Sequence, residues 1–334
     1  MKRRFVRGVL AVMAAALSPS LWPDPIAAQS AAKEPHWPDR PIRFIVPFQP
    51  GSSSDTIARI VGQKLGERLG QQLVIENKVG GASVVGTEAI ARAEPDGYTI
   101  GLANTTTHAG TTGLGGALPF DPVKDFTPVA MIGNSPFVLL VTPGLTARSV
   151  QELIGLAKER PGTLNYASAG PGSTTHLAGA LFASMAGIEL THVPYRGTGQ
   201  SVLDIMEGRI EMVFGTIAPS LSYIRSGKLR ALATTGEKRT AMLPELPTLA
   251  EAGLRGYEAG LWTAIVLPAG APADIVRRLN QEVNAAVNSP ELRAALDKQG
   301  VETDTGTPES LAARIKADLV KWRDVAMKAG VRAQ

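Results

Sequence analysis

Two short runs of glycine and serine have the residue types of a ligand-binding turn. The first, "IRFIVPFQPGSSSD" at residues 42–55, is an apolar strand pattern that ends at Pro50-Gly51 and continues into three serines and an aspartate. The second, "LNYASAGPGSTTHLAG" at residues 164–179, repeats this construction with Gly-Pro-Gly and Ser-Thr-Thr. Hydroxyls in such turns can act as nucleophiles, as a phosphate cradle, as a ligand clamp, or as ordinary turn and helix-cap groups.

A helical pattern follows the hydroxyl residues in both runs. Gly51 can take a positive φ, and Ser54 or Asp55 can cap the first helix. The first turn of a helix leaves N–H groups unpaired, and its dipole attracts negative charge. Ligands of open α/β sheets lie at the carboxyl ends of the strands. Two such turns that face each other would therefore hold an anion between them.

Two further stretches place polar residues after a strand pattern. "YTIGLANTTTH" at 98–108 ends in a hydroxyl-rich run that includes Thr105, and "HVPYRG" at 192–197 brings an aromatic residue and an arginine. The same residues could instead serve only the structure, with the histidines as buried hydrogen-bonding groups and the aromatic residue as a packing residue. Whether these stretches bind a ligand or are ordinary structural turns depends on whether they lie close together in the folded protein.

The motifs of nucleotide binding and serine hydrolysis are not met. A Walker A loop starting at Gly51 would need Gly-Lys where the chain has Thr56-Ile57, and "GPGSTT" has Thr175 in place of the third glycine of GxGxxG. The nucleophile-elbow pattern GxSxG does not occur. A serine hydrolase therefore rests on residue types alone.

The N-terminus has the pattern of a secretory signal peptide. Residues 1–28 hold four Lys or Arg and one Asp, with an apolar stretch from Val9. Cleavage is expected after Ala28, with a site near Ala32 as the alternative. Without them, the 34 basic and 30 acidic residues of the chain become 30 and 29, so the basic excess belongs to the signal. A nucleic-acid partner is not expected, since no basic face or recognition module is readable. We expect a periplasmic protein.

Cysteine is absent from the 334 residues, and only four histidines occur. The core must therefore hold the fold without disulfides, which a mature chain of this length can do. No spacing matches a metal site, and we expect no metal and no cofactor.

The hydrophobic pattern alternates strands with helices and then becomes helical. Strands are expected at 42–47, 73–76, 98–103, 137–142, 164–168, 189–193, 210–214, 229–234 and 262–267. Helices are expected at 55–69, 83–93, 149–159, 174–186, 199–207, 218–226, 272–288, 290–299 and 308–329. This order predicts an α/β protein of two lobes with a helical C-terminus. Strands 137–142 and 262–267 are the candidate crossings, which gives lobe 1 at 36–137 plus 262–334 and lobe 2 at 138–261.

Several stretches together resemble one family. "WPDRPIRFIVPFQPGSSSDTIARIV", "NKVGGASVVGTEAIARAEPDGYTIGLA", "LPFDPVKDFTPVAMI", "LNYASAGPGSTTHLAGALF", "HVPYRGTG", "SGKLRALATT", "LPTLAEAGLRGYEA" and "LPAGAP" resemble, in order from about Trp37 onward, the substrate-binding proteins of tripartite tricarboxylate transporters, the TctC-like or Bug family. The resemblance implies a periplasmic receptor with a type II binding-protein fold, which closes two lobes on a small organic anion, often a carboxylate, and delivers it to a membrane permease. It implies no catalysis.

The resemblance also implies ligand contacts from both Gly/Ser loops. Carried onto this chain, the contacts are Phe48, Gly51, Ser52, Ser53, Asp55, Ser168, Gly170, Gly172, Ser173, Thr174 and His176, with Tyr195, Arg196 and Gly197 matching the family's "PYRG" loop. Thr105 and Gly215 complete the candidate set. A monomer is expected, because no apolar dimer helix is readable.

Two positions depart from the family pattern. The first loop has Gly51 followed by three serines where relatives read closer to "PGGGTD", and Gly215 stands where relatives often have an aspartate. We predict a larger or more anionic ligand than in relatives that keep this aspartate. An adaptor that docks a sensor protein is a third function class that this fold would allow.

Overall fold

The computed structural model describes residues 37–111, 118–195 and 198–331. Trp37–Gln334 forms one compact unit. The predicted signal peptide, and Arg196 and Gly197 of the "PYRG" loop, lie outside the described residues.

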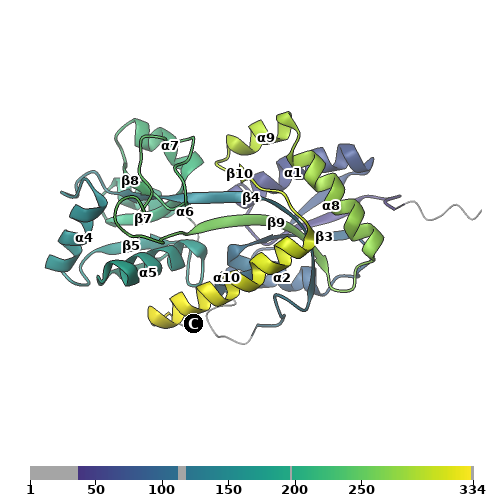
Figure 1. Ribbon diagram of the computed structural model, residues 1–334, viewed down its shortest axis with the longest axis horizontal. Coiled ribbons are helices and arrows are strands. Elements are labelled where there is room, and N and C mark those ends of the chain that lie inside the picture. The colour runs from purple at the N-terminus through teal and green to yellow at the C-terminus, as the bar shows by residue number, and fades with distance from the viewer. Residues whose placement is uncertain (1–36, 112–117, 196–197, 332–334) are drawn as a thin grey trace, which may run out of the picture. The chain divides into compact units, whose positions relative to one another are not determined.

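The described chain alternates strands and helices and ends in three helices (Figure 1). The strands are β1 (Ile42–Val46), β2 (Leu73–Asn77), β3 (Thr99–Asn104), β4 (Phe126–Val141), β5 (Asn165–Ser168), β6 (Thr191–Pro194), β7 (Met212–Thr216), β8 (Arg230–Thr234), β9 (Gly260–Pro268) and β10 (Glu302–Thr303). The α-helices are α1 (Ser53–Leu69), α2 (Val84–Ala91), α4 (Val150–Glu159), α5 (Thr174–Ala186), α6 (Thr198–Met206), α7 (Ile217–Arg225), α8 (Ala273–Val287), α9 (Pro290–Asp297) and α10 (Pro308–Lys328). A 3₁₀ turn, η1 (Gly81–Ser83), and a π-helix, η2 (Thr106–Gly110), complete the order.

Strand β4 joins two groups of strands. Its first part pairs antiparallel with β9 and β10, and β9 continues through β3 and β1 to β2. Its second part pairs with β7 and β8, and β7 continues through β5 to β6. Both groups carry parallel strands at their outer sides, as the alternation predicted. We call the two groups, with their helices, the first and second lobes.

Helix starts follow the serine and threonine signals of the sequence. Five helices begin at a serine or threonine whose side chain accepts a bond from the backbone N–H three residues further on: Ser52, Ser149, Ser173, Ser289 and Thr307. The cap of α1 is therefore Ser52, and not Ser54 or Asp55 as expected. Each cap satisfies one donor that the first turn would otherwise leave unpaired. Gly70 ends α1 in the left-handed conformation.

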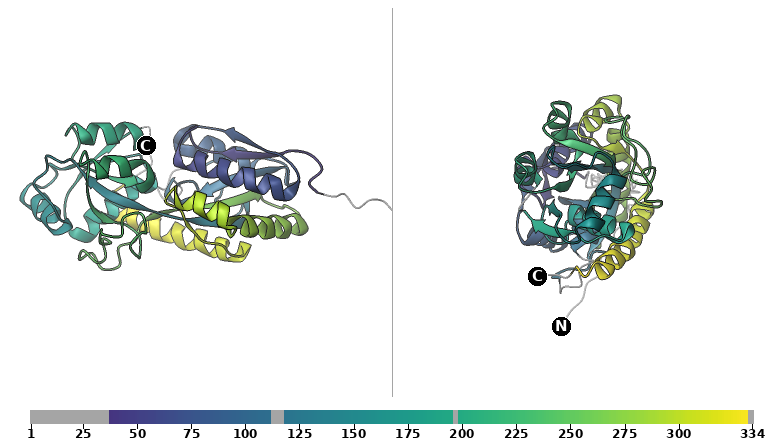
Figure 2. Two further views of the ribbon diagram at one scale, coloured as in Figure 1. Left: turned by 90° about the horizontal axis from the view of Figure 1, so that it is seen from above. Right: turned by 90° about the vertical axis from the view of Figure 1, so that its left-hand side faces the viewer.

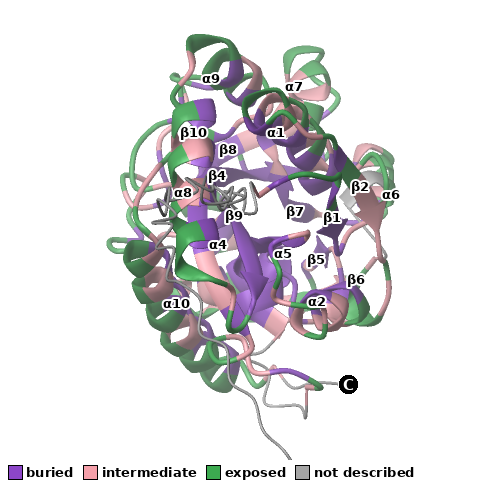
Figure 3. Cartoon of the chain, turned by 90° about the vertical axis from the view of Figure 1, so that its right-hand side faces the viewer, coloured by how far each residue is buried: buried purple, intermediate pink, exposed green. Residues whose placement is uncertain are grey.

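Each lobe has its own apolar core, and α10 contributes to both. Leu311 and Ile315 of α10 pack in a cluster with Trp262 of the first lobe. About two to three turns further on, Trp322 and Val325 pack in a cluster of the second lobe. Figures 1 and 2 show α10, in yellow, running beside β9 and β4 from one lobe to the other. Figure 3 shows the exposed outer face of α10 at the lower left and the buried strands β4 and β9 beside it in the centre. The C-terminal helix therefore braces the junction of the lobes.

The predicted α/β fold of two lobes joined by crossing strands, with a helical C-terminus, is confirmed. The expected strand 137–142 is the end of a longer strand, β4, which also contains residues 126–136. The pattern did not predict residues 126–136 because they lack a clean alternation of apolar and polar residues. The π-helix η2 and the short β10 had no sequence signal. The residue boundaries of the lobes stay a prediction.

Candidate ligand-binding site

The first Gly/Ser turn runs from the end of β1 into α1. Gly51 has a φ of +78°, and Ser52 caps α1 by accepting a bond from the N–H of Asp55. Ser54 lies in the first turn of α1, where Asn104 donates to its hydroxyl over 3.4 Å. This turn therefore presents a row of hydroxyls at the N-terminus of a helix.

Asp55 holds this turn in shape from inside. Its carboxylate accepts bonds from the N–H of Gly51 at 2.8 Å, from Arg59 at 3.0 Å and from Asn77 at 2.9 Å. Burial by itself raises the pKa of Asp55, but these donors outweigh it and the pKa is lowered. Asp55 is thus a buried carboxylate bonded within its own turn.

The second Gly/Ser turn has the same construction. Gly170 and Gly172 both have positive φ, and Ser173 caps α5 while its hydroxyl donates to the carbonyl of Gly170 at 2.7 Å. Thr174 and Thr175 form the first turn of α5, and Thr175 accepts a bond from the N–H of Ala169. The turn is closed on itself, which fixes the direction of its hydroxyls.

Two stacked histidines support the second turn from behind. The rings of His176 and His192 lie 3.8 Å apart with an interplanar angle of 9°. His176 Nδ1 accepts a bond from the N–H of Gly172, and His192 Nε2 lies 2.6 Å from the hydroxyl of Ser168. Burial and the nearby His192 lower the pKa of His176 to about 3, and burial lowers that of His192 to about 4. Both rings are therefore neutral near pH 7.

The end of β3 brings the first lobe against the second turn. Asn104 and Thr107 exchange bonds that begin the π-helix η2. The hydroxyl of Thr106 then lies 2.8 Å from that of Thr174, and the N–H of Thr174 points to the same Thr106 oxygen at 3.4 Å. Because π-helical turns occur often at functional sites, the position of η2 beside the turn fits a role in binding.

A cavity of about 130 Å³ lies where these elements meet. It is lined by Phe48, Ser52, Ser53, Ser54, Asn104, Thr106, Phe137, Ala169, Ser173, Thr174, Thr175, Thr216 and Leu261. The N-termini of α1 and α5 supply the hydroxyl side, and Phe48, Phe137 and Leu261 supply an apolar side. Such a cavity can bind a small anion that has an apolar body.

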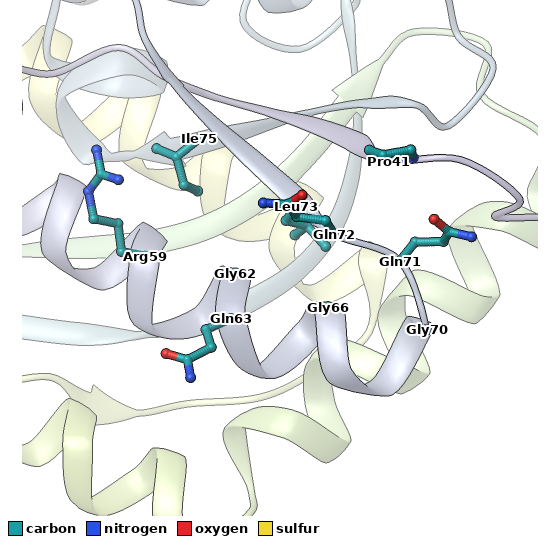
Figure 4. Close-up of a pocket in the computed structure, with 10 residues that line it drawn as sticks. All are labelled: Pro41, Arg59, Gly62, Gln63, Gly66, Gly70, Gln71, Gln72, Leu73 and Ile75. Carbon is teal, nitrogen blue, oxygen red and sulfur yellow. The ribbon is translucent and has the colours of Figure 1, made fainter.

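Larger hollows occur elsewhere on the described surface. The groove in Figure 4 has a volume of about 620 Å³ and lies between α1 and β2. It is lined by Pro41, Arg59, Gly62, Gln63, Gly66, Gly70, Gln71, Gln72, Leu73 and Ile75. All of these residues belong to the first lobe, so this groove does not bring the two turns together.

The structure places five of the predicted contacts in the cavity lining: Phe48, Ser52, Ser53, Ser173 and Thr174. Gly51 and Asp55 lie behind the first turn, and Ser168, Gly170, Gly172 and His176 lie within or behind the second. Tyr195 is adjacent through its backbone, but its hydroxyl donates to Asp204. These placements support a positioning role for the residues behind the turns, and their direct contact with a ligand stays a prediction.

Thr105 and Gly215 sit beside the cavity without lining it. The Thr105 hydroxyl bonds the backbone of Gly260 and Trp262. A Cβ built on Gly215 would approach Leu140 at 3.1 Å and the hydroxyl of Ser220 at 3.6 Å. The effect of Gly215 on the ligand stays a prediction.

The remaining lining residues were not predicted: Ser54, Asn104, Thr106, Phe137, Ala169, Thr175, Thr216 and Leu261. Most of the polar residues among them belong to stretches that the sequence analysis singled out. The sequence did not show which residues within each stretch would face the cavity. Phe137 lies within β4, Thr216 ends β7 and Leu261 lies at the start of β9, all at the junction of the lobes. No local pattern could have shown that these three strands meet at one point.

Residues 57–331 match the model of the tripartite tricarboxylate transporter family receptor. The chain belongs to this family. It is 40% identical over 288 residues to the UPF0065 protein in the tcbD-tcbE intergenic region of Pseudomonas sp. (strain P51), covering 86% of this chain and 85% of that protein. The resemblance stated from the motifs is thereby confirmed.

Two solved structures of carboxylate complexes are similar to this chain. One is R. palustris Rpa4515 with adipate, with a TM-score of 0.83, 36% identity and coverage of 89% of this chain and 99% of that one. The other is MatC (Rpa3494) from Rhodopseudomonas palustris with bound malate, with a TM-score of 0.79, 31% identity and coverage of 86% and 99%. As a member of this receptor family, the chain is a solute-binding protein and not an enzyme.

Within the described residues, no helix is both long and apolar enough to cross a membrane. The same residues contain no cluster of three or more His, Asp or Glu side chains arranged to hold a metal ion.

Proposed function

We propose that this chain is a periplasmic receptor that captures a small carboxylate between its two lobes and delivers it to a tripartite tricarboxylate-type permease. One observation carries the proposal: the N-termini of α1 and α5 converge, with their hydroxyls, on a single cavity between the lobes. Two helix N-termini aimed at one point favour negative charge there.

The ligand contacts in this proposal come first from the lining hydroxyls and amides. Ser52, Ser53 and Thr174 donate to the carboxylate, while Phe48 covers its apolar part. Ser173 donates as well once its hydroxyl turns away from the carbonyl of Gly170. Gly51, Asp55, Ser168, Gly170, Gly172 and His176 hold the turns in the binding geometry. Tyr195, Arg196 and Gly197 of the "PYRG" loop are further ligand contacts in this proposal, and Arg196 and Gly197 lie outside the described residues.

The size of the cavity limits the ligand. An engineered protein cavity of about 150 Å³ holds benzene, so about 130 Å³ suits a short-chain acid. The similar structures that contain adipate and malate support this size class.

The energy of such a site suffices for receptor binding. A hydrogen bond to a charged group contributes about 1.5–3 kcal/mol net, and micromolar affinity needs about 8 kcal/mol in total. Four or five bonds to one carboxylate therefore suffice after the ordering costs. Membership of a transporter receptor family and the signal-peptide pattern support delivery to a permease and residence in the periplasm.

Thermal unfolding of the mature chain against a panel of acids tests the proposal. The panel contains adipate, malate, an aromatic acid and the neutral amide of each. A ligand at about 100 times its Kd adds about 2.7 kcal/mol to the free energy of unfolding, which raises Tm by a few degrees. We expect a shift with acids and none with their amides. A shift with the amides alone, or no shift with any acid, would contradict carboxylate capture.

A further inference from the structure

The junction of the lobes lies at one peptide step of β4. Pro136 is the last β4 residue paired with β9, opposite Gly260, and Phe137 is the first paired with β7, opposite Thr216. On the other edge of β4, β10 pairs with Gly133 and Asn134 of β4, and β8 pairs from Val138. Both neighbours of β4 therefore change within a few residues, and no sheet ladder runs through the junction.

A buried threonine ties the two crossing segments on the second-lobe side. The hydroxyl of Thr235 accepts a bond from the N–H of Phe137 at 2.7 Å and donates to the carbonyl of Ala259 at 2.5 Å. The backbone of Thr235 adds a bond to each of the same two residues. Thr235 is fully buried, so water cannot replace these bonds while the lobes stay folded.

A second buried threonine ties the same segment on the first-lobe side. The hydroxyl of Thr105 donates to the carbonyl of Gly260 at 3.2 Å and accepts from the N–H of Trp262 at 3.0 Å. Its chain neighbours Asn104 and Thr106 both line the ligand cavity. The step from Ala259 to Gly260 is thus held by one hydroxyl from each lobe.

We propose that Thr235 and Thr105 are positioning residues that fix the hinge at Pro136–Phe137 and Ala259–Gly260, and so set the distance between the two halves of the ligand site. Hinges are a few residues at element ends that absorb the backbone change of lobe closure. Removing one hydroxyl leaves buried polar groups of the hinge backbone without their partner, which loosens the hinge and populates arrangements in which the α1 and α5 turns no longer face one ligand. Only the competent fraction binds, so the apparent Kd rises as that fraction falls.

Two neighbouring threonines serve as matched controls. Thr234 and Thr263 are fully buried like Thr235 and Thr105, and their hydroxyls have no hydrogen-bond partner among the described residues. Thr→Val keeps the shape of the side chain at all four positions. Only the variants at 235 and 105 remove bonds to the hinge.

The test measures the distance between the lobes without any ligand. Because the chain has no cysteine, Gln63→Cys on α1 and Glu159→Cys on α4 place two spin labels at exposed positions, one per lobe. We expect Thr235→Val and Thr105→Val to broaden the distance distribution from pulsed electron paramagnetic resonance. Thr234→Val, Thr263→Val and the hydroxyl-keeping Thr235→Ser should match the parent. Equal distributions in all variants, or equal broadening in the controls, would overturn the proposal.

Hydrogen exchange in the unmodified protein covers the case in which a valine variant does not fold. In that experiment, the amides of Phe137 and Trp262 should be as protected from exchange as those of Leu139 and Ala264 in the flanking strand ladders. Fast exchange at both hinge amides would overturn the proposal.

The inference rests on the proposed capture of a carboxylate between lobes. Adding adipate to the labelled protein tests carboxylate capture separately from the hinge. If adipate does not bind, the proposed capture fails, but the ligand-free distances that test the hinge threonines stay the same.

Discussion

The hydroxyl of Thr106 lies 2.8 Å from the hydroxyl of Thr174, and this bond joins the first lobe to the second at the edge of the ligand cavity. Thr106 belongs to the π-helix after β3, and Thr174 opens α5. Both side chains are buried. The two lobes therefore meet through hydroxyls at the place where a ligand carboxylate would bind.

Thr106→Val should weaken carboxylate binding. The substitution leaves the Thr174 hydroxyl without this partner and removes a donor from the cavity, and a net hydrogen bond is worth about 0.5–1.5 kcal/mol, or about 2- to 12-fold in Kd. Isothermal titration with the acid selected by thermal shift measures the change. Thr263→Val, which removes a buried hydroxyl outside the lining, is the control. An unchanged Kd in Thr106→Val would show that this hydroxyl plays no part in binding.

Ser173→Ala should lower both the stability and the affinity, whereas Ser149→Ala should lower the stability alone. Each serine caps a helix of the second lobe, Ser173 at α5 and Ser149 at α4, and the loss of a cap costs about 0.5–2 kcal/mol. Only Ser173 lines the cavity. Urea unfolding and ligand titration on both variants separate the two effects. Equal affinities in the two variants would remove Ser173 from the set of ligand contacts.

The protein should lose stability as the pH falls from about 6.5 toward 4. Burial lowers the pKa of His108 to about 3 and that of His192 to about 4, and burial with the nearby His192 lowers that of His176 to about 3. The unfolded chain takes up these protons near pH 6.5, while the folded chain resists them. Because the unfolded state then binds more protons, the free energy of unfolding falls with falling pH.

Urea unfolding at several pH values between about 7.5 and 4.5 measures this slope. His192→Gln should flatten it, since one of the three groups is removed. The stability lost through Asp55, whose pKa is lowered, appears only below its unfolded value near 4, so the two windows are distinct. A stability that stays constant from neutral pH to 4.5 would contradict the buried neutral state of the histidines.

Trp322→Ala should strongly destabilise the protein. Trp322 is 1% exposed and anchors the C-terminal part of α10 in the core of the second lobe. Truncating a buried tryptophan costs about 3–5 kcal/mol. Val320→Ala on the same helix is the control, because Val320 is 61% exposed. Similar unfolding midpoints for the two variants would mean that α10 does not brace the second lobe.

Much of the fold could be predicted from the chain, because its elements carry local signals. The strand and helix periods and the serine caps lie within short windows, and α5 begins and ends where the pattern placed it, at residues 174 and 186. The two Gly/Ser turns were recognisable for the same reason, since a positive φ needs glycine and a helix start favours serine. The family, too, could be identified from motifs in order.

The tertiary structure decided which of these residues meet. The side chains of Asp55 and Ser168 turn into their own loops. The hydroxyl of Thr105 bonds β9, while its chain neighbours Asn104 and Thr106 line the cavity. Phe137, Thr216 and Leu261 reach the cavity only because three strands that are distant in sequence meet at one junction. Local preferences set the conformation of each segment, whereas the direction of a side chain at a lobe junction depends on packing between residues far apart in the chain. The sequence therefore determined the turns, and the fold determined the site.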